Sequence, residues 1–265
     1  MAGVLEAIKK GFSVAGKSLS LVLVLVIFNL IGNLASMPFA IAQGQTPTPQ
    51  MTAGALIFTV VFILISIFVQ GGALSLVRDL IKEGKMKLAS FASYGAKYYL
   101  KLLGLGVLIV LIISVVALIA ALIVAITAPL NNPIVSGIAI TIAVLIGIAA
   151  ALLYFIPFAL SPYALICENL GIIGSMKRSL AVAKKPFVRV LFLVLLFVIL
   201  MLISLGVGVV FGFLVGLISA VIPAGIAKIL MAVVTSMING YLGVVMMGSF
   251  MVYYLGLTAK GDKVV

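Results

Sequence analysis

One acidic and several basic side chains gather between two of the most hydrophobic stretches of the chain, in the segment SPYALICENLGIIGSMKRSLAVAKKPFVRV (161–190). Ammonium and guanidinium groups beside a carboxylate can hold a phosphate head group or an acidic surface of a partner protein. We favour a solvated ion pair at a membrane surface, which contributes little to stability, and keep head-group or partner binding as the alternative. The residues concerned are Glu168, Lys177, Arg178, Lys184 and Lys185.

A second group of polar residues lies inside stretches that are otherwise apolar. Asn29 and Asn33 are four residues apart, so they share one face of a helix. Such side chains either line a path for a substrate or join helices through hydrogen bonds worth about 0.6–2 kcal/mol, and we favour the second interpretation. The group comprises Asn29, Asn33, Gln70, Ser161, Thr235, Ser236 and Asn239.

Several kinds of chemistry are disfavoured by what the sequence lacks. There is no His, the commonest general base and metal ligand, and the single Cys167 is expected to be an inert thiol. No ionisable residue stands in the middle of an apolar stretch, since Arg78, Asp79 and Lys101 lie near stretch ends, where long side chains reach the interface. We therefore expect no proton relay, no metal, no cofactor and no enzymatic activity.

The elements that position these residues are long apolar stretches in a chain that is 65% hydrophobic and 8% charged. This composition is typical of membrane proteins. Each stretch exceeds the roughly 20 residues that a helix needs to cross a bilayer, and an open strand could not satisfy its backbone there. The sequence predicts an all-α polytopic membrane protein with six transmembrane helices at 18–42, 54–80, 100–128, 134–166, 187–222 and 227–257.

The basic residues are distributed unevenly along the chain. All of the 17 Lys and Arg residues except Lys228 fall in the N-terminal arm, the second and fourth connections, the C-terminal tail or the adjoining helix ends. Basic connections stay in the cytoplasm, so we expect both termini on the cytoplasmic side of the plasma membrane. The net charge of +12 would then face anionic lipids of the inner leaflet. Nucleic acid is not expected as a partner, since no basic soluble domain is present.

The predicted helices form three hairpins in series, approximately 1–84, 85–171 and 172–265, within a single transmembrane domain, 1–265. Each hairpin begins with a short segment whose apolar residues recur at helical spacing, with basic residues on the opposite face. This pattern is typical of an amphipathic helix in the cytoplasmic interface. In the third such segment Asn169 is expected to cap the helix. The expected apolar stripes are Val4, Leu5, Ile8, Phe12 and Ala15 in the first segment, and Ile173, Met176, Leu180 and Ala183 in the third.

Small residues mark the last two predicted helices. Gly208, Gly212 and Gly216 form a GxxxGxxxG pattern, which lets another helix approach closely. We favour packing within the monomer and keep a homo-oligomer interface as the alternative. The last helix combines glycine with methionine, which fills irregular gaps, so its first expected role is core packing.

Glu168 and Gly171, followed by Lys177, Arg178 and Ser179 in MKRSLAVAKKPF, carry a family resemblance. The pattern resembles that of YciC-like proteins and of the membrane domain found beside some glycerophosphodiester phosphodiesterases. The resemblance implies six helices in three hairpins over most of the chain. It does not imply phosphodiesterase activity, which needs a soluble barrel with metal-binding carboxylates and His.

The sequence thus favours an integral membrane protein that handles lipid or a small solute at the inner leaflet without a proton relay. Its cavity is expected between the hairpins, open towards the basic face. The alternative is a membrane scaffold or accessory subunit that docks a partner protein through its cytoplasmic interfacial helices. Membrane lipids are the expected partners in the first case, and a protein partner or a homo-oligomer in the second.

Overall fold

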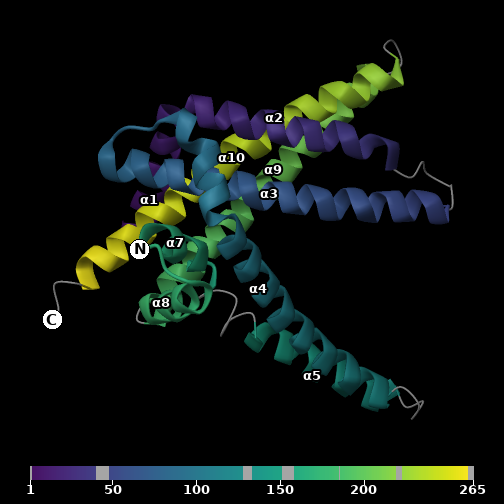
Figure 1. Ribbon diagram of the computed structural model, residues 1–265. Helices are drawn as coiled ribbons and strands as arrows, with labels where there is room; N and C mark the ends of the chain where they lie inside the picture. Colours follow the sequence, from purple (N-terminus) through teal and green to yellow (C-terminus); the bar gives the residue numbers. More distant parts are fainter. Residues whose placement is uncertain are drawn as a thin grey trace. The chain divides into compact units, whose positions relative to one another are not determined.

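The computed structural model describes residues 2–39, 48–127, 133–150, 158–184, 186–218 and 223–261, and every regular element in these ranges is a helix (Figure 1). Five helical segments are long and apolar enough to cross a membrane, which suggests a membrane protein. They are Leu19–Phe39, Pro49–Glu83, Leu88–Thr127, Phe187–Leu217 and Gly225–Ala259.

The chain divides into two compact units. Unit 1 comprises Met1–Tyr99 and Phe192–Val265, and unit 2 comprises Leu100–Leu191. The boundaries between them fall within two long helices, α4 (Phe91–Thr127) and α9 (Phe187–Ile218).

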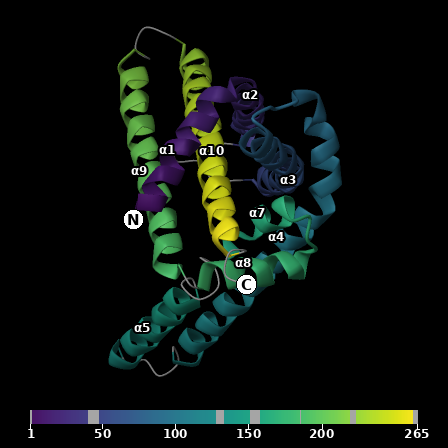
Figure 2. The same cartoon turned by 90° about the vertical axis from the view of Figure 1, so that its left-hand side faces the viewer.

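The last helix, α10 (Ala224–Gly261), is the central helix of unit 1 and packs against α1 (Ala2–Lys17) and α2 (Leu19–Ser36). Figure 2 shows α1 lying across α10. Glycines make these contacts close: a Cβ at Gly248 would lie 3.3 Å from the Cα of Gly11, and a Cβ at Gly240 would lie 2.8 Å from the backbone nitrogen of Val26. Core packing by the small residues of the last helix is confirmed.

The core of unit 1 gathers at one end of its long helices. Seven consecutive residues are buried near the C-terminal end of α3 (Pro49–Glu83), from Gly71 to Val77. Leu21 is buried near the start of α2, and Tyr254 is buried near the end of α10. The other halves of these helices stay apolar and exposed, as at Ile57, which is 67% exposed. Extended apolar surface of this kind requires a non-aqueous partner.

Aromatic side chains join α2, the short 3-10 helix η1 (Met37–Phe39) and α3 into an antiparallel pair. Phe28 stacks on Phe62 at 4.8 Å between ring centroids, and Phe39 stacks on Phe58 at 5.7 Å. Thr48 caps α3, because its hydroxyl accepts a hydrogen bond from the backbone N–H of Met51 at 3.2 Å. A second 3-10 helix, η2 (Leu88–Ser90), precedes α4.

Unit 2 contains the Leu100–Thr127 part of α4, α5 (Pro133–Ala150), α7 (Ser161–Cys167) and α8 (Ile172–Lys184). The fourth predicted span, 134–166, corresponds to α5 and α7, with 151–157 outside the described residues. A helix predicted to end near Lys184 is found as α8, and its location at a membrane interface stays a prediction. The next helix follows Pro186, as predicted.

Asn169 does not cap α8, contrary to our prediction. It lies just beyond the end of α7 and has a φ of 51°, in the left-handed region, whereas α8 begins only at Ile172. Asn is one of the few side chains that accept this conformation readily, and a left-handed residue commonly follows the last turn of a helix. The residue thus belongs to the end of one helix and not to the start of the next.

Candidate functional site

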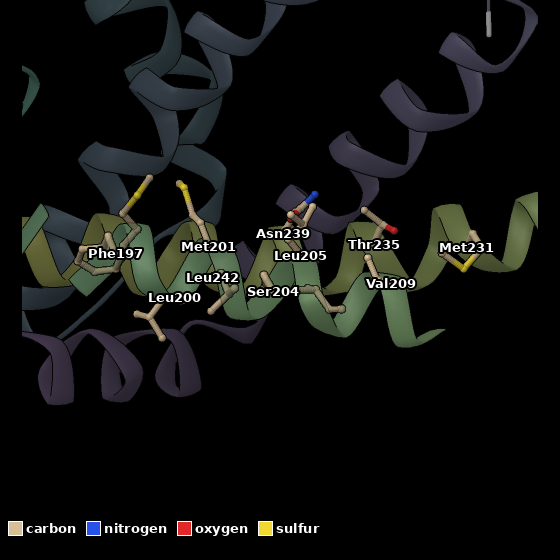
Figure 3. A pocket seen from close by; sticks show the side chains of 13 residues that line it. Phe197, Leu200, Met201, Ser204, Leu205, Val209, Met231, Thr235, Asn239 and Leu242 are labelled. Carbon is tan, nitrogen blue, oxygen red and sulfur yellow. The ribbon is translucent and has the colours of Figure 1, made fainter. Parts of the chain in front are cut away.

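The α9–α10 groove is an elongated cavity of about 480 Å³ within unit 1, between two antiparallel helices (Figure 3). Phe197 of α9 stacks on Phe250 of α10 at one end, at 5.2 Å between ring centroids. The walls are mostly aliphatic and methionine side chains. The lining residues are Phe197, Leu200, Met201, Ser204, Leu205, Gly208, Val209, Met231, Thr235, Ile238, Asn239, Leu242 and Met246.

Three polar side chains interrupt these apolar walls. The hydroxyl of Ser204 is buried and has no hydrogen-bond partner among the described residues. The side chains of Thr235 and Asn239, which face the same cavity from α10, likewise make no hydrogen bond to the described part of the chain. Figure 3 labels Ser204 on α9 and the other two residues on α10, and all three line the same cavity. The groove therefore offers one donor-acceptor amide and two hydroxyls to whatever occupies it.

A second cavity of about 530 Å³ adjoins the groove on the side of the α9–α10 connection. The two cavities share Met231 and Thr235. The lining of the second cavity also includes Asn33 of α2 and Lys228 of α10, so this end carries a cation. Its lining residues are Asn33, Met37, Gly212, Val215, Gly216, Ala227, Lys228, Met231, Ala232 and Thr235.

The three glycines of the GxxxGxxxG pattern line these two cavities. Gly208 faces the groove, and a Cβ there would meet nothing within 4 Å. Gly212 faces the second cavity with Gly216, and a Cβ at Gly212 would meet only the methyl group of Met231, at 3.5 Å. In unit 1 these glycines leave space for a ligand, and the homo-oligomer interface stays a prediction.

The polar residues predicted within the apolar stretches do not form one continuous path in the structure. Asn239 faces the groove, and Asn33 faces the second cavity while its amide donates to the Ser236 hydroxyl at 2.9 Å. Asn29 donates to a carbonyl of its own helix. Gln70 is exposed on α3, and Ser161, whose hydroxyl has no partner among the described residues, belongs to unit 2.

Sequence reasoning missed the most informative groove residue. Ser204 is a single hydroxyl in the middle of a strongly apolar helix, which is a detectable signal. Which residues of α10 face it depends on the register of two helices, and hydropathy does not encode this register. Lys228 was also detectable in the sequence, because it is the one basic residue that lies outside the termini, the second and fourth connections and the adjoining helix ends.

The predicted basic cluster lies in unit 2 and is built around an ion pair. Arg178 Nε donates to both carboxylate oxygens of Glu168 at 3.0 Å, and the two side chains are 38% and 29% exposed. Lys177 and Lys184 are exposed on α8, and Lys185 lies outside the described residues. An ion pair this accessible to solvent contributes little to stability.

The apolar stripe predicted for α8 is divided between buried and exposed positions. Met176 and Ala183 are buried, whereas Ile173 is 64% exposed and Leu180 is 42% exposed. The location of this stripe in the membrane interface stays a prediction. Two serines are buried on the same helix, which packs against α7 within unit 2. The buried residues of α8 are Ser175, Met176, Ser179 and Ala183.

Unit 1 also contains a polar network that the sequence did not reveal. Arg78 donates to Asp79 Oδ1 through Nη2 at 2.7 Å and Nε at 2.9 Å, and to the Tyr98 hydroxyl at 3.3 Å. The ring of Tyr94 lies 5.4 Å from the guanidinium carbon of Arg78. The side chains of Arg78 and Asp79 are only 17% and 13% exposed, so their main role is to stabilise the packing of unit 1.

The described residues define a class of protein: an all-helical chain, five of whose helical segments are long and apolar enough to cross a membrane. The chain belongs to a family described as Domain of unknown function (DUF7847), whose family model matches residues 2–257. No curated protein and no solved structure matches the chain. Within the described residues no group of three or more His, Cys, Asp or Glu side chains could hold a metal ion.

Proposed function

We propose that this chain is an integral membrane protein that binds a lipid or another amphiphilic molecule in the α9–α10 groove. The observation that carries the proposal is the coexistence of apolar walls with three polar side chains, Ser204, Thr235 and Asn239, that lack partners among the described residues. In hydrocarbon an unpaired polar group is costly, so a ligand with both an apolar body and a hydrogen-bonding group suits this site best.

The size and composition of the groove support the same ligand class. Ligand cavities commonly have volumes of about 300–1,000 Å³, apolar walls and a few polar groups that fix the orientation of the ligand. The methionine side chains of the walls are flexible and adapt to irregular apolar shapes. Of the groove residues, none is a titratable base, so binding or movement of the ligand suits the site better than its chemical conversion, and we propose that the chain is not an enzyme.

The proposed topology has six membrane crossings arranged as three hairpins, with both termini in the cytoplasm at the plasma membrane. Five helices can cross by themselves, and α5 with the segment up to α7 would make the remaining crossing. This return crossing would bring the basic helix α8 to the same side as Lys85 and Lys87, as the distribution of Lys and Arg demands. The lysines of α8 would then meet anionic lipids of the inner leaflet.

This topology predicts opposite labelling of two exposed positions when each carries the only cysteine of a Cys167→Ser background. Thr48→Cys lies at the start of α3 and should react in intact cells with a membrane-impermeant maleimide. Lys85→Cys lies beyond the other end of α3 and should react only after the membrane is permeabilised. Equal labelling of both positions in intact cells would contradict the proposed orientation.

The groove can be filled without disturbing the fold, and this change tests the proposed function. Gly208→Leu places a side chain in the cavity at a position where a Cβ meets nothing within 4 Å. We expect native mass spectrometry of the purified chain to show a co-purified lipid or amphiphile on the wild type. The occupancy should fall about tenfold in the variant, because a leucine side chain occupies space that the apolar part of the ligand needs.

Gly206→Leu is the matched control. It lies on the same helix, has equal space for a Cβ and does not line either cavity. It should retain the ligand at the wild-type level. The proposal fails if the wild type carries no amphiphile in any membrane extract, or if both leucine variants retain it equally.

A second function is favoured by the exposed face of α8. Ile173, Lys177, Leu180 and Lys184 follow one another at helical spacing and are all exposed, so this helix presents an apolar and basic stripe. The stripe suits a scaffold or accessory subunit that docks a partner protein on the cytoplasmic side.

This second function can be tested by purification of the chain with its bound proteins. It is favoured over ligand handling if a protein is recovered at fixed stoichiometry with the wild type and is lost in an Ile173→Ser/Leu180→Ser variant.

The resemblance to the YciC-like family remains a proposal. The helix α8 supports it by carrying the basic part of the motif.

A further inference from the structure

Lys228 stands at the end of the two cavities remote from Phe197. Among the described residues that line the α9–α10 groove or the second cavity, it is the one with a charged side chain. In the described part of the chain it makes no ion pair, since the ion pairs there are Lys10–Glu6, Arg78–Asp79 and Arg178–Glu168. The cavity beside it supplies only the neutral polar groups of Asn33 and Thr235. An anion at this place would therefore find a cation and hydrogen-bonding groups together.

The two cavities together form a long and narrow site. They adjoin through Met231 and Thr235, and along α10 they extend from Lys228 to Met246. Eighteen residues of α-helix correspond to about 27 Å, close to the roughly 30 Å of hydrocarbon in a bilayer. A site of this length suits an extended chain with a head group at one end better than a compact solute. Its apolar end, at Phe197 and Met246, is the end remote from the cation.

A lysine in an apolar helix is unfavourable unless its head reaches water or an anion. Lys228 lies one turn after the start of α10 and is exposed, so its ammonium group can remain at the membrane surface. It is also the one basic residue that the proposed topology places on the non-cytoplasmic side, where basic residues are disfavoured. A negatively charged ligand would offset the unfavourable placement of a basic residue on that side.

We infer that the ligand of the groove is an anionic amphiphile, whose carboxylate or phosphate group pairs with Lys228 and whose apolar chain extends along α9 and α10 towards Phe197. This inference rests on the proposed function and adds to it the charge class and the orientation of the ligand. A charge-assisted hydrogen bond to an ammonium group is the interaction that separates an anionic from a neutral amphiphile of equal chain length.

The test compares oleate with its neutral glycerol ester, monoolein, on the purified full chain in a non-ionic detergent. The wild type should bind oleate about tenfold more tightly than monoolein. Lys228→Gln should bind both probes equally, at the affinity of monoolein, whereas Lys228→Arg should keep the preference. Lys85→Gln, which removes one exposed positive charge elsewhere, should behave as the wild type.

The outcomes separate this inference from the proposed function. Equal binding of the two probes by the wild type, or a preference that survives in Lys228→Gln, would overturn the role of Lys228 while the groove itself stands. No binding of either probe, or unchanged binding in Gly208→Leu, would refute the groove as the site. Binding of dioleoyl phosphatidylglycerol is measured in the same way, and tighter binding of this lipid than of oleate would indicate a phosphate rather than a carboxylate head group. Displacement of oleate by inorganic phosphate alone would overturn the amphiphile and indicate a simple anion site.

Discussion

Replacing Gly11 by valine is expected to destabilise unit 1 by about 3 kcal/mol and to release α1 from α10. A Cβ at this position would overlap the hydroxyl of Ser249 and approach the carbonyl oxygen of Val245 to 2.6 Å. The carbonyl belongs to the helix backbone and cannot rotate away, so the two helices must separate. Overpacking of a tight interface typically costs about 1–3 kcal/mol, and more where backbone is involved.

Two measurements report this effect. Thermal unfolding of the purified chain in detergent, followed by circular dichroism, should show a lower midpoint. Trypsin should cleave α1 faster at Lys9 and Lys10, which are exposed but protected from cleavage while the helix is packed. The matched control is Gly16→Val in the same helix, where a Cβ meets nothing within 4 Å. Equal destabilisation by both changes would contradict the role of the interface, because replacing an uncrowded helical glycine by valine should not by itself lower stability.

The positions of the long helices could be predicted from the sequence because hydropathy is a local property. The predicted spans 54–80 and 187–222 overlap α3 and α9 almost fully, and the separation of α8 from α9 at Pro186 follows from proline chemistry. The fourth span illustrates the limit of the method. Continuous hydropathy over 134–166 does not show that the described residues fall into two separate helices.

The faces of the short helices could not be predicted, because periodicity does not tell whether an apolar stripe meets lipid or another helix. In α1 the expected stripe included Leu5 and Phe12, which are 56% and 39% exposed. Val4 and Ala15 of this stripe are buried, and so are the small residues Ala7 and Gly11 outside it, with Gly11 directly against α10. In α8 the small residues Ser175 and Ser179 are likewise buried. Helices that pack closely have small side chains at the contact, whereas a search for amphipathic spacing finds the positions of large apolar side chains.

The groove was inaccessible to sequence reasoning for a different reason. Asn239 was recognised as a polar residue within a span, but its isolation from hydrogen-bond partners and its position opposite Ser204 depend on how two helices 20 or more residues long align. The glycine pattern indicated close packing, and around Gly208 the structure has open space. A small residue allows either close helix contact or open space beside the helix, and which of the two occurs depends on the position of the neighbouring helix.

The second large effect is expected at the polar network of α3 and α4. Asp79→Asn should destabilise unit 1 by about 2–3 kcal/mol. The side chain of Arg78 is only 17% exposed, and the substitution removes its counter-charge. Hydrogen bonds to charged groups contribute about 1.5–3 kcal/mol, and removal of one partner of a buried ion pair is costly because the other charge stays desolvated. Tyr98 is 1% exposed and remains as a hydrogen-bond acceptor for Arg78, which limits the loss.

Glu83→Gln provides the matched control, since it removes the same charge from an exposed position of the same helix and should leave the unfolding midpoint nearly unchanged. The double variant Arg78→Met/Asp79→Leu should recover most of the stability that Asp79→Asn loses, because it removes both charges and keeps the volume apolar. If the double variant is as unstable as the single one, the uncompensated charge is not the cause. The loss would then come from the contacts that Arg78 makes with the ring of Tyr94 and the hydroxyl of Tyr98, and these two tyrosines would be what holds the start of α4 against the end of α3.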